Sequence, residues 1–349
     1  MFNSNPVLGI IGGGQLGSFL ASSAKKLGIK TVILTDDPLA PAKSFCDEII
    51  ISNYSQKQKL EEFVSKVNVV TFEFENIPFE VLSFISKNKK VLPSPEINKI
   101  VQNRNEEKKF IKNLGITTTP WIYVNSKNDI EKNKDMLPGI LKTCTLGYDG
   151  KGQHLINNLN EIDENWFSLN EYILEKKINL KQEISVIITR FENGDCYIYE
   201  PIENIHKEQI LKKSKIPANI NQDIYKQSQN VAKKIAKKLN FIGTMCVEYF
   251  IDIQNNLIVN EIAPRVHNSG HLTLNAFDIS QFDNHVRAIC GLKNLPNKKI
   301  SNAEMINILG SDINNYKNRK YSNNEYFFDY LKKDIRDKRK MGHLTILKY

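Results

Sequence analysis

The segment Asn260–His271, NEIAPRVHNSGH, gathers side chains that can do chemistry directly after the short apolar run Leu257–Val259. It holds a carboxylate, a guanidinium, two imidazoles, amides, a hydroxyl and a glycine. Carboxylate and amide oxygens suit a hard cation such as Mg²⁺, and a planar guanidinium suits an anion that accepts two parallel hydrogen bonds. The segment therefore predicts a strand end that binds ligands of both signs.

A β-hairpin is predicted over MCVEYFIDIQNNLIVNEIAP. If its turn lies at Gln254–Asn255 or Asn255–Asn256, Glu248 and Glu261 point from the same face, and directly opposed side chains lie roughly 5 Å apart. Two carboxylates that close repel each other unless a cation lies between them or one is protonated. With the Asn260 oxygen beside them, they predict a nucleotide-bound Mg²⁺. The alternative is a hairpin with ordinary surface glutamates, and a three-residue turn would put the two carboxylates on opposite faces.

A glycine-rich loop, GYDGKGQ (Gly147–Gln153), follows the strand-like GILKT. Its glycines let backbone N–H groups approach phosphate oxygens, and Lys142 on the strand adds positive charge. The loop is not a P-loop, because the GK[ST] pattern is absent. A phosphate-binding loop is one interpretation, and a tight hairpin turn without a ligand is the other.

The N-terminal segment GIIGGGQLG contains the spacing GxGxxG at Gly12, Gly14 and Gly17, with Asp36 about twenty residues further on. This fingerprint of a dinucleotide-binding loop supports an NAD-dependent oxidoreductase. The same loop also builds Rossmann-like turns that bind no dinucleotide, so both interpretations stay open.

His267 and His271 have the spacing of two zinc ligands on a helix. Their segment reads as a loop and no third ligand lies nearby, so we do not expect zinc. We expect polar recognition, with Arg265 as an anion fork and His267 as a hydrogen-bond donor. A basic group near the C-terminus is either a solvated charge run or a second anion site, and it comprises Arg336, Arg339 and Lys340.

Hydrophobic patterns predict the elements that position these groups. Val7–Ile11, Lys30–Leu34 and Val67–Phe72 read as buried strands that open a β-α-β unit. An amphipathic helix over NRNEEKKFIKNLGI ends at Gly115. Beyond Ile184 the strands EISVIITR and CYIYEPI predict an antiparallel sheet, and a helix over Tyr225–Leu239 precedes the hairpin.

Composition bounds the class of protein. The chain has 349 residues, 41% of them hydrophobic, which supports two or three domains around a shared cleft. No run of about 18 apolar residues and no signal peptide are found, so we expect a cytoplasmic protein without a membrane partner. The five cysteines are far apart and predict reduced thiols. The net charge of +9 is spread along the chain, which favours an anionic small substrate over nucleic acid.

The motifs occur in one order: GGGQLG, NR…KKF, LK, GYDGKGQ, ILEKKI, NIH, VEYF, NEIAPRVHNSGH and RKMGH. In this order the sequence resembles the N5-carboxyaminoimidazole ribonucleotide synthetase family of ATP-grasp enzymes over nearly its whole length. NEIAPRVHNSGH together with GYDGKGQ is highly specific, whereas GGGQLG alone is not. The resemblance implies an α/β and α+β fold of ATP-grasp architecture, with a Rossmann-like N-terminal domain (1–115), a small lid domain (116–183) and a C-terminal domain built on a mixed or antiparallel sheet (184–349).

The resemblance also implies a reaction. ATP, bicarbonate and 5-aminoimidazole ribonucleotide give ADP, phosphate and the N5-carboxylated product in de novo purine synthesis. Bicarbonate is a poor electrophile, and transfer of the γ-phosphoryl group would make carboxyphosphate, from which phosphate can leave. Mg²⁺ is the expected ion, with Mn²⁺ as an alternative, and the expected assembly is a homodimer.

Site residues follow from the resemblance position by position. The nucleotide-binding positions are Arg104, Lys142, Gly147, Tyr148, Asp149, Gly150, Lys151, Gly152, Gln153, Glu175, Lys176, Lys177, Ile178, Glu183, His206, Asn260 and Glu261. The metal ligands are Glu248 and Glu261. The positions for the ribonucleotide and bicarbonate are Gln15, Tyr148, Lys151, Arg265, His267, Asn268, Ser269, Lys333, Arg336 and Arg339. The catalytic positions are Lys333, Arg265, His267 and Asp149, the last of which would orient or deprotonate the attacking amine.

Some positions depart from the family pattern. Lys151 stands where arginine is usual, so a bidentate phosphate grip becomes a point charge. The usual RPGRK reads RDKRK, and Lys332 competes with Lys333 for the substrate-binding role. Three alternatives remain: another ATP-grasp enzyme, such as a formate-dependent transformylase or a biotin carboxylase-like protein; an NAD-dependent oxidoreductase; and a nucleotide-binding regulator without turnover.

Overall fold

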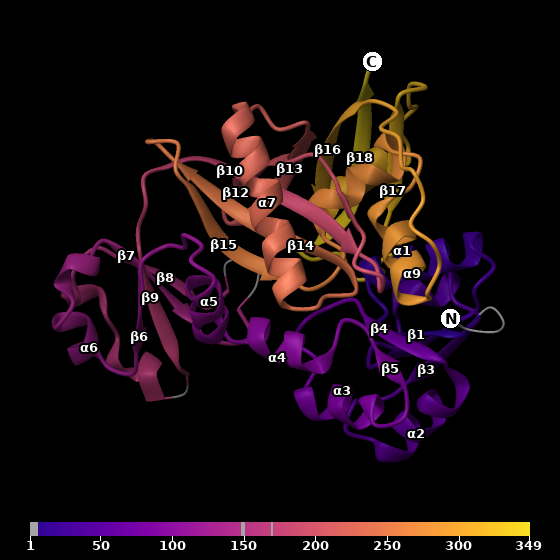
Figure 1. The fold of residues 1–349 in the computed structure, drawn as a ribbon, viewed down its shortest axis with the longest axis horizontal. Coiled ribbons are helices and arrows are strands. Elements are labelled where there is room, and N and C mark those ends of the chain that lie inside the picture. Colours follow the sequence, from indigo (N-terminus) through magenta and orange to yellow (C-terminus); the bar gives the residue numbers. More distant parts are fainter. Residues whose placement is uncertain (1–5, 148–150, 169) are drawn as a thin grey trace.

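The computed structural model describes residues 6–147, 151–168 and 170–349. These residues form three β-sheets with helices between and around them, and each sheet takes its strands from a separate stretch of the chain (Figure 1). The domain boundaries predicted at 115 and 183 remain predictions, although the strands of the second sheet lie within 121–176 and those of the third within 180–348.

The first sheet is parallel, with strand order β3-β2-β1-β4-β5. Its strands carry near-continuous apolar runs because helices cover both faces. The three strands expected here from the sequence are confirmed to within two residues. The elements are β1 (Leu8–Ile11), α1 (Gln15–Lys26), β2 (Thr31–Thr35), β3 (Glu48–Ile51), α2 (Lys57–Lys66), β4 (Val69–Phe72), α3 (Phe79–Ser86) and β5 (Lys90–Val91).

Two helices, α4 (Pro95–Gln102) and α5 (Arg104–Asn113), lead from the first sheet to the second. The Asn103 side chain caps α5 by accepting from the backbone N–H groups of its first turn. The helix ends at Asn113, and Gly115 two residues later has a φ of +66°, a left-handed conformation that favours glycine. The amphipathic helix and its stop are therefore as predicted.

The second sheet is antiparallel and small, with order β6-β9-β7-β8. It lies apart from the first sheet at one end of the molecule (Figure 1). Its elements are β6 (Trp121–Val124), α6 (Lys127–Glu131), β7 (Gly139–Thr143), β8 (Gln153–Ile156) and β9 (Tyr172–Lys176).

The third sheet is antiparallel, with order β15-β14-β10-β12-β13-β16-β18-β17 and β11 paired to β10. Helix α7 packs on β10 and β14, and α9 packs on β14 and on α1 of the first domain. The elements are β10 (Leu180–Arg190), β11 (Cys196–Ile198), β12 (Ile202–Lys207), β13 (Ile210–Ile216), α7 (Gln222–Lys238), β14 (Gly243–Asp252), β15 (Leu257–Ala263), α8 (Thr273–Ala276), α9 (Gln281–Ile289), β16 (Asn302–Leu309), α10 (Ile313–Lys317), β17 (Glu325–Asp329) and β18 (Lys340–Lys348).

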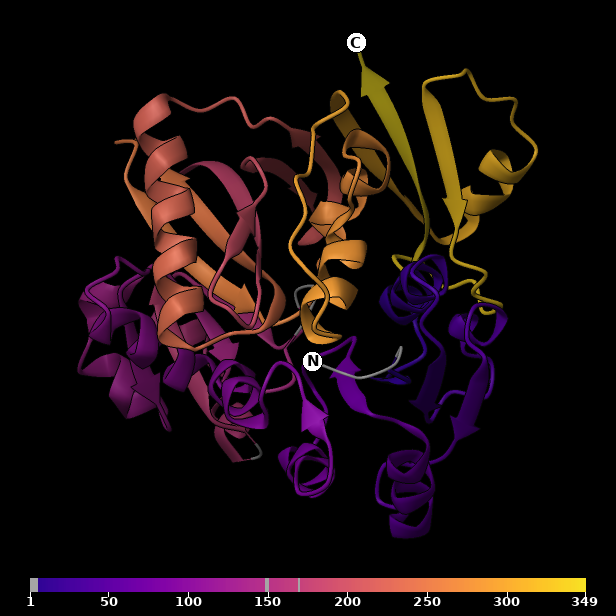
Figure 2. The same ribbon diagram turned by 45° about the vertical axis from the view of Figure 1, so that its right-hand side comes forward.

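The first and third sheets share a hydrophobic core. Leu16 and Leu20 of α1 belong to the same buried cluster as Phe282 and Val286 of α9. The two views agree that the C-terminal strands lie beside α1 (Figures 1 and 2). The C-terminal segment therefore lies next to α1 and the GxGxxG loop (Gly12–Gly17) at its start (Figures 1 and 2).

The ranges that the structure describes contain no helix long and apolar enough to cross a membrane. Within those ranges all five cysteines are free thiols, as predicted.

Candidate active site

Glu248 on β14 and Glu261 on β15 are directly opposed across the hairpin. The predicted turn is wrong, because Ile253–Asn255 separate Asp252 from Asn256 and the strands near the turn pair in a register that would put the two carboxylates on opposite faces. A β-bulge at Asn260 then shifts the register by one residue. The carboxylates face each other because the bulge reverses the effect of the longer turn.

Glu248 is held by the imidazole of His267, whose Nε2 lies 2.9 Å from its Oε1. Burial alone would raise the pKa of Glu248, but the nearby charges of His267, His206 and Arg265 outweigh burial and lower the pKa to about 2. The carboxylate is therefore ionised at neutral pH and ready to bind a cation. His267 Nδ1 lies 2.8 Å from the Ser269 hydroxyl, which orients the ring.

The Cys246 thiol is adjacent to this pair. Within the described part of the chain, ligand atoms of Cys246, Glu248 and His267 all lie within 4.8 Å of one another. A thiol and an imidazole suit softer cations than Mg²⁺, so the oxygen-only set of Glu248, Glu261 and Asn260 is the one that fits Mg²⁺. Asn260 Oδ1 is buried and has no hydrogen-bond partner among the described residues, so an oxygen ligand is present there without another use.

Glu261 connects the hairpin to the glycine-rich loop through Arg104, the first residue of α5. Arg104 Nη1 donates to Glu261 Oε2 at 2.8 Å, and its Nη2 donates to the Gly147 carbonyl at 3.3 Å. The guanidinium therefore lies where a loop, a helix start and a carboxylate meet. A phosphate at this point would face an arginine that is already fixed in place.

Lys142 on β7 extends toward the same region from the second sheet. Its Nζ donates to Glu175 Oε2 at 2.7 Å, and Lys108 Nζ lies 2.9 Å from Glu175 Oε1. Burial alone would raise the pKa of Glu175, but the two ammonium groups lower it to about 2. Glu175 is thus a buried carboxylate between two buried lysines, rather than a residue that offers only its backbone.

Farther along the third sheet, Glu183 on β10 and His206 on β12 lie side by side, with His206 Nδ1 2.9 Å from Glu183 Oε2. Burial would lower the pKa of His206, but the Glu183 and Glu248 carboxylates raise it. Of the predicted nucleotide contacts, His206 therefore lies near Glu248, one of the two predicted metal ligands.

Arg265 points at a partner that sequence reasoning did not find. Both carboxylate oxygens of Glu75, which follows β4, accept from its Nε and Nη2, the latter at 3.0 Å. Glu75 therefore has a lowered pKa, because Arg265 outweighs the effect of burial. Arg265 thus presents the expected guanidinium for an anion, but in this structure the carboxylate of Glu75 already binds it.

The side chains of the next residues are buried and bonded within the protein. Ser269 belongs to a chain of buried hydroxyls and amides that includes Ser185, 2.9 Å from it. Asn268 is buried and exchanges two amide hydrogen bonds with Asn307 on β16, so its side chain braces the loop. His271 is buried beside Phe19 and contacts Gln15, so His267 and His271 point to different partners and form no zinc pair.

The basic C-terminal segment reaches the first domain through Lys332. Its Nζ donates to Gln15 Oε1 at 2.8 Å and to the Lys340 carbonyl at 2.7 Å. Lys333 is exposed. Arg336 is exposed and paired with Asp334, whose carbonyl also accepts from Arg339 Nη1 at 2.8 Å. The neighbouring lysines thus differ in role, since Lys332 anchors the segment and Lys333 leaves its side chain on the surface.

The GxGxxG loop is already filled. Glu73, at the end of β4, is buried, and its carboxylate accepts from the backbone N–H of Gly14 and, at 2.6 Å, from that of Gly17. These are the amides that a dinucleotide pyrophosphate would need at the start of α1. Their engagement by an internal carboxylate argues against the NAD-dependent alternative.

Of the predicted loop residues, Tyr148, Asp149 and Gly150 lie outside the described residues. Lys142 and Gln153 are paired across β7 and β8, so the segment joins two strands of one hairpin. Gly152 has a φ of +71°, where glycine is favoured. The adenine-linker positions begin at the end of β9 and continue past it, and of these Lys176 and Lys177 are exposed and Ile178 is half-buried.

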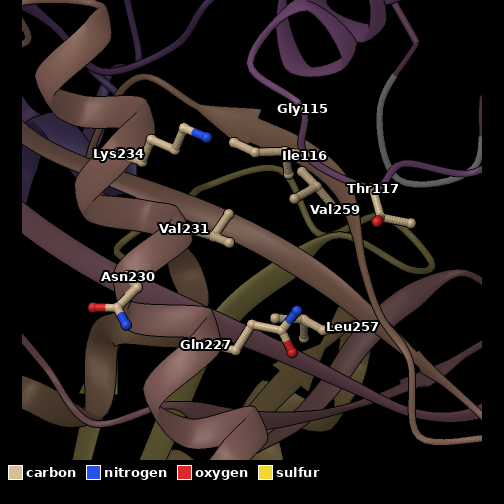
Figure 3. Close-up of a pocket in the computed structure, with 9 residues that line it drawn as sticks. All are labelled: Gly115, Ile116, Thr117, Gln227, Asn230, Val231, Lys234, Leu257 and Val259. Atoms are coloured by element: carbon tan, nitrogen blue, oxygen red, sulfur yellow. The ribbon is translucent and has the colours of Figure 1, made fainter.

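A surface pocket of about 410 Å³ lies between the α5–β6 connection, α7 and β15 (Figure 3). It contains none of the predicted site residues. Its polar side chains are amides, a hydroxyl and Lys234, whose Nζ donates to the Leu114 carbonyl at 2.7 Å. Because this pocket contains no carboxylate, we place the candidate active site instead at the charged side chains described above, around Glu248, Glu261 and Arg104.

Sequence reasoning missed the residues that hold the assigned ones. Glu73 and Glu75 directly follow a predicted buried strand, which is where parallel sheets place functional side chains. Lys108 is four residues after Arg104 and therefore on the same helix face. These positions could therefore have been predicted from the sequence. Glu107, whose carboxylate accepts from the Ile262 N–H at 2.6 Å, could be identified only from the fold.

Opposed carboxylates on an antiparallel sheet, with a lysine and a glycine-rich loop on a second small sheet, define an ATP-grasp enzyme. Residues 109–282 match the ATP-grasp domain model and residues 6–102 the ribonucleotide synthetase preATP-grasp domain. Residues 303–349 match the phosphoribosylaminoimidazole carboxylase C-terminal domain. The chain belongs to the N5-carboxyaminoimidazole ribonucleotide synthase family.

Full-length relatives support this membership. The N5-carboxyaminoimidazole ribonucleotide synthase of Staphylococcus aureus strain COL is 39% identical, covering 97% of this chain and 92% of the relative. That of Bacillus subtilis strain 168 is 35% identical, covering 98% and 91%. A crystal structure of the Staphylococcus aureus enzyme with ADP has a TM-score of 0.93 at 37% identity, covering 99% and 94% of the chains. The Aspergillus clavatus enzyme with ADP and 5-aminoimidazole ribonucleotide has a TM-score of 0.91 at 27% identity, covering 100% and 95%.

Proposed function

We propose that this chain catalyses the ATP-dependent carboxylation of 5-aminoimidazole ribonucleotide by bicarbonate, to give the N5-carboxylated ribonucleotide in purine biosynthesis. The observation that carries the proposal is the direct opposition of Glu248 and Glu261, with Arg104 reaching from Glu261 to the glycine-rich loop. This arrangement supports the binding of a divalent ion next to a polyphosphate.

Glu248, Glu261 and the unused oxygen of Asn260 fit Mg²⁺ or Mn²⁺ by donor chemistry. When bound, the ion neutralises charge on the nucleotide phosphates. Arg104 and Lys142 bind and orient the phosphates from two other elements. In this proposal the backbone of Glu175–Ile178 holds the adenine, Glu183 the ribose, and His206 a further part of the nucleotide.

The chemistry proceeds through carboxyphosphate. Transfer of the γ-phosphoryl group to bicarbonate makes phosphate the leaving group in place of hydroxide. The amine of the ribonucleotide then attacks the carboxyl carbon. The protein positions the reactants and neutralises charge, and we assign to the loop Gly147–Gln153 the role of protecting the intermediate from water.

Arg265, His267 and Ser269 face the bicarbonate and the ribonucleotide, and Asp149 orients or deprotonates the amine. We assign substrate binding to Lys333, because the ammonium of Lys332 is already engaged with Gln15 and the Lys340 carbonyl. In this proposal Gln15 acts by anchoring the C-terminal segment through Lys332, and Arg336 and Arg339 of that segment bind the ribonucleotide. A cytoplasmic homodimer is part of this proposal.

Phosphate release from ATP tests the function. We expect release that requires both bicarbonate and 5-aminoimidazole ribonucleotide, with the carboxylated product formed in equal amount. Release that is independent of the ribonucleotide would contradict the assignment and favour another ATP-grasp activity. ATP binding without release would favour a regulator.

A further inference from the structure

Lys108 is a buried lysine that none of the reaction steps above uses. It lies on α5 with a side chain that is 2% exposed, and its Nζ lies 2.9 Å from Glu175 Oε1 on β9. The same Nζ donates to the Thr118 hydroxyl at 3.0 Å and to the Asn260 carbonyl at 3.3 Å. One ammonium group therefore connects the lid sheet, the α5–β6 connection and the bulge beside Glu261.

The Thr118 connection is itself tied to the metal strand. The Thr118 hydroxyl donates to the Val259 carbonyl at 3.0 Å, and the Val259 N–H donates to the Thr117 carbonyl at 2.9 Å. Figure 3 shows Thr117 beside β15, at the edge of the surface pocket. Lys108 thus lies where the chain passes from α5 to the second sheet, which is the predicted lid domain.

Glu175 needs a resident counter-ion if Lys142 is to bind a nucleotide. Without ligand, Lys142 donates to Glu175 Oε2 at 2.7 Å. A phosphate that draws Lys142 away would leave Glu175 buried and charged, and an uncompensated buried charge is costly. The other contacts of Lys108 are with the Thr118 hydroxyl and the Asn260 carbonyl, so its ammonium group stays beside Glu175 when the phosphate binds.

We infer that Lys108 is a positioning residue, which keeps Glu175 charged and in place while Lys142 exchanges that carboxylate for the nucleotide phosphates. The inference rests on the proposed nucleotide-binding role of Lys142. The lowered pKa of Glu175 agrees with it, because both lysines contribute to the shift. By holding the Asn260 carbonyl as well, Lys108 fixes the bulge that turns Glu261 toward Glu248.

The test is a double-mutant cycle of Lys108→Met and Glu175→Gln, read out by calorimetric ADP binding with Mg²⁺ and by the KM for ATP. Lys108→Met alone is expected to weaken ADP binding by at least about tenfold, because Glu175 then retains Lys142. In the Glu175→Gln background the same change is expected to alter ADP binding by less than about threefold. An equal loss in both backgrounds would overturn the inference, because a purely structural lysine has that effect.

Controls separate this result from misfolding and from failure of the proposed function. Lys109→Met removes the neighbouring lysine, which is paired with exposed Glu106, and should leave ADP binding unchanged. If Lys108→Met does not fold, Lys108→Gln retains a donor for Thr118 and carries the same comparison. ADP binding does not depend on the carboxylation, so a wild-type protein that binds ADP but does not turn over would refute the proposed function and still decide the role of Lys108.

Discussion

Glu261→Gln separates catalysis from folding. The Glu261 side chain is 38% exposed and its ion pair with Arg104 spans 2.8 Å. A partly exposed ion pair contributes about 0–1 kcal/mol, so the free energy of unfolding should change by no more than that. The substitution removes one of the two charged ligands proposed for the metal and leaves Arg104 without its carboxylate. We expect kcat/KM to fall at least about a thousandfold, which corresponds to about 4 kcal/mol.

The assay is phosphate release with ATP, bicarbonate and 5-aminoimidazole ribonucleotide, run beside thermal unfolding. Glu304→Gln is the matched control, because Glu304 pairs with Lys213 at 2.7 Å in the same sheet and is 17% exposed. It should keep wild-type turnover. Near-normal turnover of Glu261→Gln would remove Glu261 from the metal site and refute the hairpin argument. An equal loss in the control would show that the sheet, and not the metal, is affected.

Three further outcomes are expected. Glu73→Ala should lower the free energy of unfolding by about 2–4 kcal/mol, because two backbone N–H donors lose a charged acceptor. Added phosphate should restore part of this stability by binding the freed amides. A thermal stability that does not respond to phosphate would contradict this view of the loop. Lys333→Met should raise the KM for the ribonucleotide more than Lys332→Met does, and the reverse order in steady-state kinetics would exchange their roles. Burial lowers the pKa of His285 from 6.5 to about 3, so the unfolded chain takes up a proton first as pH falls. The contribution of His285 to stability should therefore fall by about 1.2 kcal/mol from pH 7 to about pH 5.5, and urea unfolding of His285→Asn should show a correspondingly shallower pH dependence; an unchanged slope would contradict the shift.

The hairpin shows how far sequence reasoning reaches. Strand positions and the apolar-polar alternation predicted that Glu248 and Glu261 face each other, and they do. A two-residue turn was expected, whereas Ile253–Asn255 form a three-residue turn and Asn260 forms a β-bulge. Each one-residue shift of register reverses the face, so the two departures cancel. A bulge depends on packing against other elements, such as Lys108 on α5, and local pattern does not contain that information.

Long-range pairing accounts for the rest of what could not be predicted. The glycine motif near Gly14 is compatible with a dinucleotide until Glu73, which is far along the chain, is seen to fill it. Arg265 was expected to bind an anion, but its internal partner Glu75 comes from another domain. Local residues define what a loop can bind, and only the assembled fold shows what already binds it.

If Arg265 binds an anionic substrate, as proposed, its bond with Glu75 makes that binding a substitution of one anion for another. An arriving carboxylate or phosphate takes over hydrogen bonds that already exist, so part of its affinity is spent on displacing Glu75. Release of the product is favoured in turn, because Glu75 can again pair with the Arg265 guanidinium as the product dissociates. This suits a product that carries one more carboxylate than the ribonucleotide from which it was made.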